Sequence, residues 1–179
     1  MTLYLLLGLA AIIVAFVLIV ALQPAAFTIA RQTAINAAPK DVFGYANDLH
    51  KFQEFSPFVD FDPAAKTEFT GPAAGVGAVF KWNGNNKAGQ GVMTVIESRP
   101  PELVRLRLEF LRPFKATNTA EFTFKPQGGQ TVAIWSMSGK NNFMGKTFSL
   151  CLNSDKMIGR EFEKGLAKLK QLCERVAVK

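Results

Sequence analysis

The sequence has few of the residues that metal sites and most enzyme active sites need. Its 179 residues include one histidine, His50, and two cysteines, Cys151 and Cys173. Zinc sites need clusters of such ligands, so we expect no metal. No Gly-x-Ser-x-Gly segment is present, and a serine triad would have to use His50, whose ordinary role is a surface or capping residue. The glycine-rich residues 71–77 lack the lysine and hydroxyl of a phosphate loop, so we expect no cofactor.

Charged residues are missing from the start of the chain. All 21 basic and 14 acidic side chains lie after residue 22. The uncharged run at residues 2–22 would span ~31 Å as a helix, close to the thickness of a bilayer's hydrocarbon core. We therefore predict a transmembrane anchor at residues 1–23 and one globular domain at residues 26–179. A cleaved secretory signal is the alternative, but no Lys or Arg precedes the run and no small-residue cleavage site follows it.

Two features place the globular domain on the cytoplasmic face. Arg31 and Lys40 follow the anchor while no basic residue precedes it, and the more basic flank stays inside. Cys151 and Cys173 would lie ~33 Å apart if one helix carried both, too far for a disulfide. Two unpaired thiols fit a reducing compartment.

The rest of the chain has strand and helix patterns in a simple order. Residues 27–35 alternate as a strand, and two short helices follow at residues 39–48 and 49–55. Further strands are predicted at residues 66–70, 76–82, 91–98, 103–111, 117–125 and 131–138, with turn residues between them. Residues 155–178 have apolar side chains at helical spacing. The pattern predicts an α+β domain in which an antiparallel sheet of about seven strands is covered on one side by the long C-terminal helix.

Four stretches carry a resemblance to a known superfamily: GPAAGVGAVFKWNGN (71–85), ESRPPELVRLRLEFLRPFKATNTAEFTF (97–124), WSMSGKNNFMGK (135–146) and DKMIGREFEKGLAKLK (155–170). With the element order, they resemble the START-like or Bet v 1-like superfamily, and membrane-anchored bacterial proteins of the polyketide cyclase/dehydrase or SRPBCC type. The resemblance implies the helix-grip fold, in which the curved sheet wraps the C-terminal helix and leaves a cavity for lipids, sterols or polyketides. It carries no universal catalytic motif, so no catalytic residue is assigned.

The inward-facing positions of the strands and helix give a predicted cavity lining. It comprises Phe80, Trp82, Met93, Val95, Glu97, Leu106, Leu108, Phe110, Asn118, Phe122, Trp135, Met137, Phe143, Met157, Ile158, Glu161 and Phe162. Within this set the start of the helix (157, 158, 161, 162) is the predicted roof, beside a lid loop at residues 140–147, while Leu169, Cys173 and Val176 seal the helix against the sheet. An inward amide at Asn118 needs a partner from the protein, water or a ligand. Glu97 lies at a strand end, where it can instead reach solvent.

These patterns leave three functions open. We expect a binding protein for an apolar small molecule or lipid, because many Phe and Met residues suit an adaptable apolar pocket. An enzyme acting on an apolar substrate would need an inward acid or base, for which Glu97 is the candidate before the final helix. An interaction module would have a filled core and an exposed apolar patch. Basic and acidic residues are interspersed, which argues against nucleic acid as a partner. The net charge of +7 and the short connection to the predicted anchor instead suggest contact with anionic head groups. No oligomeric state is predicted.

Overall fold

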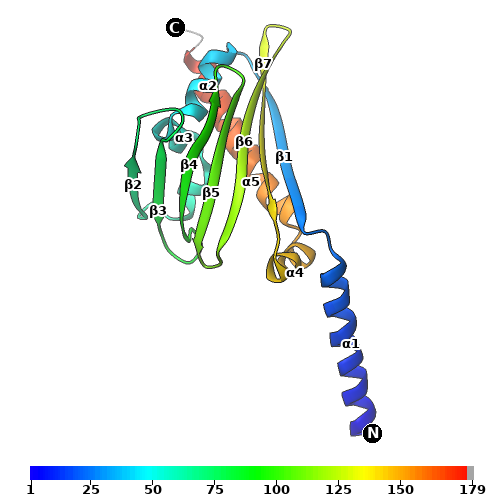
Figure 1. The fold of residues 1–179 in the computed structure, drawn as a ribbon. Helices are drawn as coiled ribbons and strands as arrows, with labels where there is room; N and C mark the ends of the chain where they lie inside the picture. The colour runs from blue at the N-terminus through cyan, green and yellow to red at the C-terminus, as the bar shows by residue number, and fades with distance from the viewer. Residues whose placement is uncertain (177–179) are drawn as a thin grey trace.

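The computed structural model describes residues 1–176 and consists of a projecting N-terminal helix and an α+β domain (Figure 1). Helix α1 (Thr2–Leu22) is followed by strand β1 (Ala26–Ile35) and by the short helices α2 (Pro39–Asn47), α3 (Leu49–Phe55) and η1 (Pro57–Phe61). The remaining strands are β2 (Lys66–Thr70), β3 (Val79–Asn83), β4 (Gln90–Arg99), β5 (Leu103–Arg112), β6 (Ala116–Gln127) and β7 (Gln130–Lys140). Helices α4 (Phe143–Leu152) and α5 (Ser154–Val176) complete the chain.

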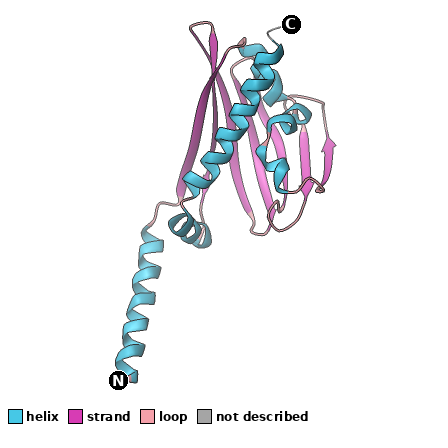
Figure 2. Cartoon of the chain, turned by 180° about the vertical axis from the view of Figure 1, so that it is seen from behind, coloured by secondary structure: helices cyan, strands magenta, loops and turns pink. Residues whose placement is uncertain are grey.

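The strands form one antiparallel sheet of seven strands in the order β1-β7-β6-β5-β4-β3-β2. Strands β2 to β7 follow one another as hairpins, and β1 pairs with β7 from Ala26 opposite Lys140 to Ile35 opposite Thr131. Helix α5 crosses one face of the sheet, with α2 and α3 beside it (Figure 2). We call this covered face the inner face. The arrangement confirms the helix-covered antiparallel sheet that the sequence pattern predicts and the helix-grip fold that the resemblance implies.

Helix α1 extends away from the sheet, and its side chains are almost all exposed (Figure 1). It is the one helix among residues 1–176 that is long and apolar enough to cross a membrane, with a mean hydropathy of 3.2 over its most apolar stretch. Only Val20 of α1 is buried. The segment joining α1 to β1 is short, so the end of the sheet at which β1 begins lies next to α1. We call this end of the sheet the α1 end.

The predicted strands agree with the observed ones to within three residues at each boundary, but the structure contains two helical elements that we did not predict. Residues 140–147, predicted to be a lid loop, instead enter helix α4 at Phe143. Asn142 begins this helix by accepting a hydrogen bond from the Gly145 amide through its side chain. Asn153, in the left-handed conformation with a φ of 46°, separates α4 from α5. The lid-loop prediction was therefore wrong.

The split also changes the prediction for the cysteines. Cys151 belongs to α4 and Cys173 to α5, so the distance estimated for a single helix does not apply. Cys173 is buried, and burial, with Asp41 and Glu174 nearby, raises the pKa of its thiol to about 12. Leu169 and Cys173 seal α5 against the sheet as predicted. The side chain of Val176 and the predicted helical residues 177–178 lie outside the described part of the chain.

Candidate ligand-binding surface

The middle of the inner face is a packed core. Seven of the strand residues predicted to line a cavity are buried there with Phe162 of α5: Phe80, Met93, Val95, Leu106, Phe122, Trp135 and Met137. The Trp135 indole stacks on the Phe162 ring with centroids 4.4 Å apart, and its centroid lies 4.8 Å from that of Phe122. These side chains therefore fill the space in which the predicted cavity would lie.

Gly165 lets α5 approach the sheet this closely. A Cβ atom at position 165 would lie 2.5 Å from Cζ3 of Trp135 and 3.1 Å from Cδ of Pro57. Both distances are shorter than ordinary contacts between carbon atoms. The Trp135 indole thus lies where a side chain at position 165 would be. This close contact between helix and sheet closes the middle of the interior.

One polar atom in this core has no partner. The Nε1 atom of Trp135 is buried and has no hydrogen-bond acceptor among residues 1–176. A buried indole N–H ordinarily finds an acceptor. It is a group to which a small polar atom, from water or from a ligand, could bind.

Burial decreases towards the α1 end of the sheet. Five inward side chains there are only half-buried, and we call them the half-buried inner patch: Phe27, Trp82, Leu108, Phe110 and Asn118. The strand registers place them on the inner face, since Asn118 pairs with Leu108, Phe110 with Gly91 and Gly91 with Trp82. Four of these side chains are apolar and one is an amide. Ile158 of α5, which we predicted to line the cavity, is also half-buried and packs against the core.

Two inward-facing glycines make room within this patch. A Cβ atom at Gly91 would lie 2.4 Å from the Trp82 ring, and one at Gly139 would lie 2.2 Å from Oδ1 of Asn118. The indole and the amide therefore lie flat over the neighbouring strands. Among the described residues, the Asn118 side-chain amide has one contact, which is weak: its Nδ2 lies 3.9 Å from Sδ of Met137. A polar group with so poor a partner on an apolar surface is suited to orient a ligand.

Glu97 is not part of the inner face, which corrects our prediction. A register shift between Val95 and Glu97 leaves Ile96 as an extra residue in β4. Because side chains alternate between faces, one extra residue moves Glu97 to the outer face and Ser98 to the inner one. Glu97 there forms ion pairs with Arg105 and with Arg99, and the Ser98 hydroxyl bonds to Asn47.

Three further residues of the predicted lining lie outside the interior. Phe143, on α4, and Met157, on α5, are 49% and 45% exposed. Glu161 forms an ion pair with Lys164 at 2.8 Å. Met157 and Glu161 line a surface hollow of about 530 Å³ along α5, with charged neighbours on each side. We predicted that residues 157, 158, 161 and 162 all face the cavity. The side of α5 that the sheet covers is narrower than this, and residues 157 and 161 lie outside it.

Residues of α3 and η1 that we did not assign to the site pack against Trp135. Phe52, Phe55 and Phe58 have ring centroids 5.8, 6.1 and 6.2 Å from the indole. Phe52 and Phe55 lie three positions apart on α3, and Phe58 and Phe61 lie three positions apart on the 3₁₀ helix η1, so each pair shares one side of its helix. Helix α3 ends at Phe55, as Ser56-Pro57 predicts, and the signal that we missed is the spacing of three between Phe58 and Phe61.

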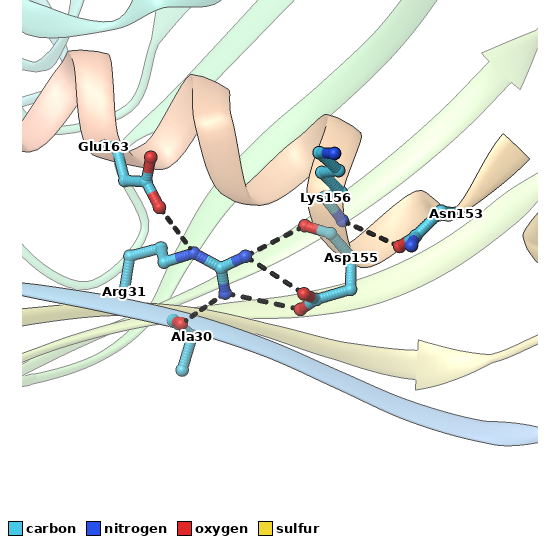
Figure 3. Close-up of polar contacts among 6 residues, drawn as sticks. All are labelled: Ala30, Arg31, Asn153, Asp155, Lys156 and Glu163. Atoms are coloured by element: carbon cyan, nitrogen blue, oxygen red, sulfur yellow. Dashed lines mark hydrogen bonds and ion pairs between the residues drawn. The ribbon is translucent and has the colours of Figure 1, made fainter.

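Arg31, from which we predicted only the membrane topology, is a charged residue on the inner face, because it pairs with Trp135. Its guanidinium donates to Glu163 from Nε at 2.9 Å and to Asp155 from Nη2 at 3.0 Å (Figure 3). Nη1 donates to the carbonyl of Ala30 at 2.8 Å. The hydrogen bonds that Arg31 donates to Asp155 and, second, to Glu163 raise the pKa of Arg31 above its ordinary value. Arg31 therefore ties the first strand to the first turns of α5.

His50 lies outside the inner patch. Its ring stacks on Phe69 with centroids 3.8 Å apart, at the edge of a hollow of about 250 Å³ between α3 and the β2–β3 connection. Its backbone amide and that of Lys51 are capped by the Asp48 carboxylate. His50 is therefore an exposed residue in the first turn of α3, in agreement with its interpretation as a surface residue, and the cap of this helix is Asp48.

Comparison with known proteins gives the family. Residues 26–174 match the model of the family described as polyketide cyclase/dehydrase and lipid transport. The chain belongs to this family. The match covers the sheet and nearly all of α5 and begins after α1. The chain matches no curated protein.

Solved structures share the fold at low sequence identity. Protein MLL2253 from Mesorhizobium loti is 16% identical with a TM-score of 0.61, over 83% of this chain and 98% of that one. Ara h 8.0201 is 11% identical with a TM-score of 0.58, over 84% and 99%. The di-domain ARO/CYC protein BexL from the BE-7585A biosynthetic pathway is 14% identical with a TM-score of 0.59, over 87% of this chain and 52% of BexL.

Proposed function

We propose that this chain binds an apolar small molecule or lipid at its half-buried inner patch, next to a membrane in which residues 1–23 form the anchor. Residues 26–179 would be the binding domain, on the cytoplasmic face. The observation that carries the proposal is a half-buried apolar surface walled by Trp82, Leu108 and Phe110. On this surface the Asn118 amide has only a thioether partner within residues 1–176. Covering this surface would gain ~25 cal/mol per Å² of apolar area removed from water.

The family supports binding or cyclase-type chemistry, and the geometry favours binding. The enzyme alternative depended on an inward carboxylate at Glu97, which instead pairs with Arg105 on the outer face. Arg31 is charged and inward, but Asp155 and Glu163 already bind its guanidinium. A general acid or base must reach the substrate, and neither group is free to do so. We therefore propose binding without turnover.

Both tryptophans of the chain lie on the inner face, which gives a direct test. The full chain carrying Trp135→Phe would be placed in phospholipid nanodiscs, so that only Trp82 emits, and titrated with a dibrominated fatty acid. Bromine quenches an indole that it contacts. We expect saturable quenching of Trp82. The reverse variant, Trp82→Phe, reports on the buried Trp135 and should be quenched much less.

A matched pair of variants separates binding from simple closeness to the bilayer. Leu108→Asn replaces a half-buried inner side chain by a polar one of similar size, and Thr119→Asn makes a polar change on the outer face of the neighbouring strand. Losing about half of a leucine's burial, ~1 kcal/mol, should raise the half-saturating concentration about five-fold for Leu108→Asn only. Thermal unfolding would check that both variants fold. Equal titrations of the parent and both variants, or no quenching of Trp82, would contradict the proposal.

A further inference from the structure

Helix α4 exposes an apolar surface that its own domain does not cover. Phe143, Met144, Phe148 and Leu150 are 49%, 57%, 45% and 43% exposed, on a helix of ten residues. Adjacent large apolar side chains exposed to this extent mark a contact with another molecule or a membrane. The opposite side of the helix is polar and held by the domain, where Asn141 donates to Ser149 at 3.2 Å and Ser149 lies 3.1 Å from Ser154.

This surface lies beside the point at which α1 ends. Nζ of Lys146 donates to the carbonyl of Ala21 at 2.9 Å, and the backbone N–H of Asn141 donates to the carbonyl of Ala25 at 2.7 Å. Figure 1 shows α4 next to the C-terminal end of α1. If α1 spans a bilayer, the level of Ala21 is the edge of the hydrocarbon region, and α4 is held at that level.

The turn between β5 and β6 has the same chemistry at the same end of the sheet. We count the last two residues of β5 with this turn, so that it comprises residues 111–115 and contains Leu111 and Phe114, which are 42% and 60% exposed. Figure 1 shows this turn and α4 at the same end of the domain, the end from which α1 departs. Two separate segments at this end of the domain thus carry exposed, bulky apolar groups.

The charges of these two segments have one sign. The β5–β6 turn carries Arg112 and Lys115, and residues 140–154 carry Lys140 and Lys146 with no acidic residue. Apolar side chains interleaved with basic ones, without acids, suit the interface of a bilayer that contains anionic lipids. A protein partner would not require basic residues without acidic ones around the apolar side chains.

We propose that α4 and the β5–β6 turn insert into the head-group region of the bilayer and fix the orientation of the domain on it. The inference rests on α1 as a membrane anchor and is independent of ligand binding at the half-buried inner patch. Phe143, Met144, Phe148 and Phe114 enter the interface, and Lys115, Lys140 and Lys146 contact lipid phosphates. The domain therefore sits on the membrane by its α1 end and does not move freely about the short connection after α1.

A tryptophan reporter on α4 tests this docking. Phe148→Trp, made in the full chain carrying Trp82→Phe and Trp135→Phe, would be placed in nanodiscs of phospholipids brominated either near the head group or near the middle of the acyl chain. We expect blue-shifted emission and stronger quenching by the shallow bromines, increased by anionic lipid. Val76→Trp in the same background is the matched control. Val76 is 59% exposed in the connection between β2 and β3, at the end of the sheet away from α1, and its reporter should not be quenched.

Three outcomes would overturn the proposal. These are equal quenching of the two reporters, a solvent-exposed emission from the α4 reporter, and a blue-shifted emission that no brominated lipid quenches. The last would mean that a second copy or another protein covers α4. Adding Leu108→Asn should leave the α4 reporter quenched, so a failure of ligand binding is distinguishable from a failure of docking.

Discussion

Gly165 offers the sharpest test of whether the interior is filled, because the same substitution at another glycine should have the opposite effect. Gly165→Ala adds one methyl group 2.5 Å from the Trp135 ring, 3.1 Å from Pro57 and 3.3 Å from the Phe55 carbonyl. Replacing a helical glycine by alanine gains about 1 kcal/mol from helix propensity. Overpacking a core costs about 1–3 kcal/mol, and contact with an enclosed ring and a backbone atom argues for the upper part of that range. We expect a net loss of ~2 kcal/mol.

Gly44, on α2, is the control, because a Cβ atom there meets nothing within 4 Å. Gly44→Ala should stabilise the domain by about 0.5–1 kcal/mol. Thermal unfolding of the full chain in detergent, followed by tryptophan emission, would measure both. At roughly 2–4 °C per kcal/mol, the midpoint should fall by about 4–8 °C for Gly165→Ala and rise by about 1–4 °C for Gly44→Ala. If Gly165→Ala were as stabilising as Gly44→Ala, α5 could lift from the sheet, and our conclusion that the core is closed would be refuted.

Two more predictions follow from the buried thiol and the inward arginine. Burial raises the pKa of the Cys173 thiol from 9.0 to about 12 in the folded chain. As pH rises, the unfolded chain therefore loses the thiol proton before the folded chain does. The free energy of unfolding should then fall between about pH 9 and about pH 12. Cys173→Ala should remove that part of the pH dependence in unfolding experiments, and an unchanged slope would contradict the assignment. Arg31→Leu should lower the unfolding midpoint by less than Phe122→Ala. The side chains of Asp155 and Glu163 are 62% and 59% exposed, so water can hydrate them when Arg31 is lost. Phe122 is fully buried, so its replacement by alanine leaves a cavity. A larger effect at Arg31 would show that the ion-pair cluster, and not the aromatic core, holds α5.

The alternation of apolar and polar residues was enough to predict the sheet. Strand β5 shows why: Val104, Leu106 and Leu108 face inward and Arg105 and Arg107 outward, as their spacing of two requires. The order of strands then follows from short hairpin connections. The same argument correctly placed Asn118 inward, because it continues the series of Ala120 and Phe122.

The same periodicity fails wherever the backbone departs from the regular repeat. The extra residue at Ile96 reverses the faces of Glu97 and Ser98, and no residue type near it signals a bulge. Helix α4 was missed because its ten residues include Gly145, Thr147 and Ser149, residue types that are frequent in loops. The filled core could not be predicted from composition, since the aromatic residues that would line a cavity are the same residues that fill one. Only the contact of Trp135 with Gly165 distinguishes the two cases.

The two proposals use the same end of the domain, and this has a kinetic consequence. The half-buried inner patch lies towards the α1 end of the sheet, and the proposed docking surface lies at that end too. A ligand that leaves the bilayer through water exposes its apolar surface, which for ~200 Å² costs ~5 kcal/mol. A docked domain receives the ligand directly and avoids this step, which is worth roughly three to four orders of magnitude in rate. The full chain with Phe148→Ser, Met144→Ser and Phe114→Ser should therefore keep its equilibrium affinity for the brominated fatty acid. Its half-buried inner patch should, however, bind the fatty acid more slowly from a preloaded bilayer. Stopped-flow quenching of Trp82 would measure this rate. Equal filling rates would mean that the ligand enters the patch from water.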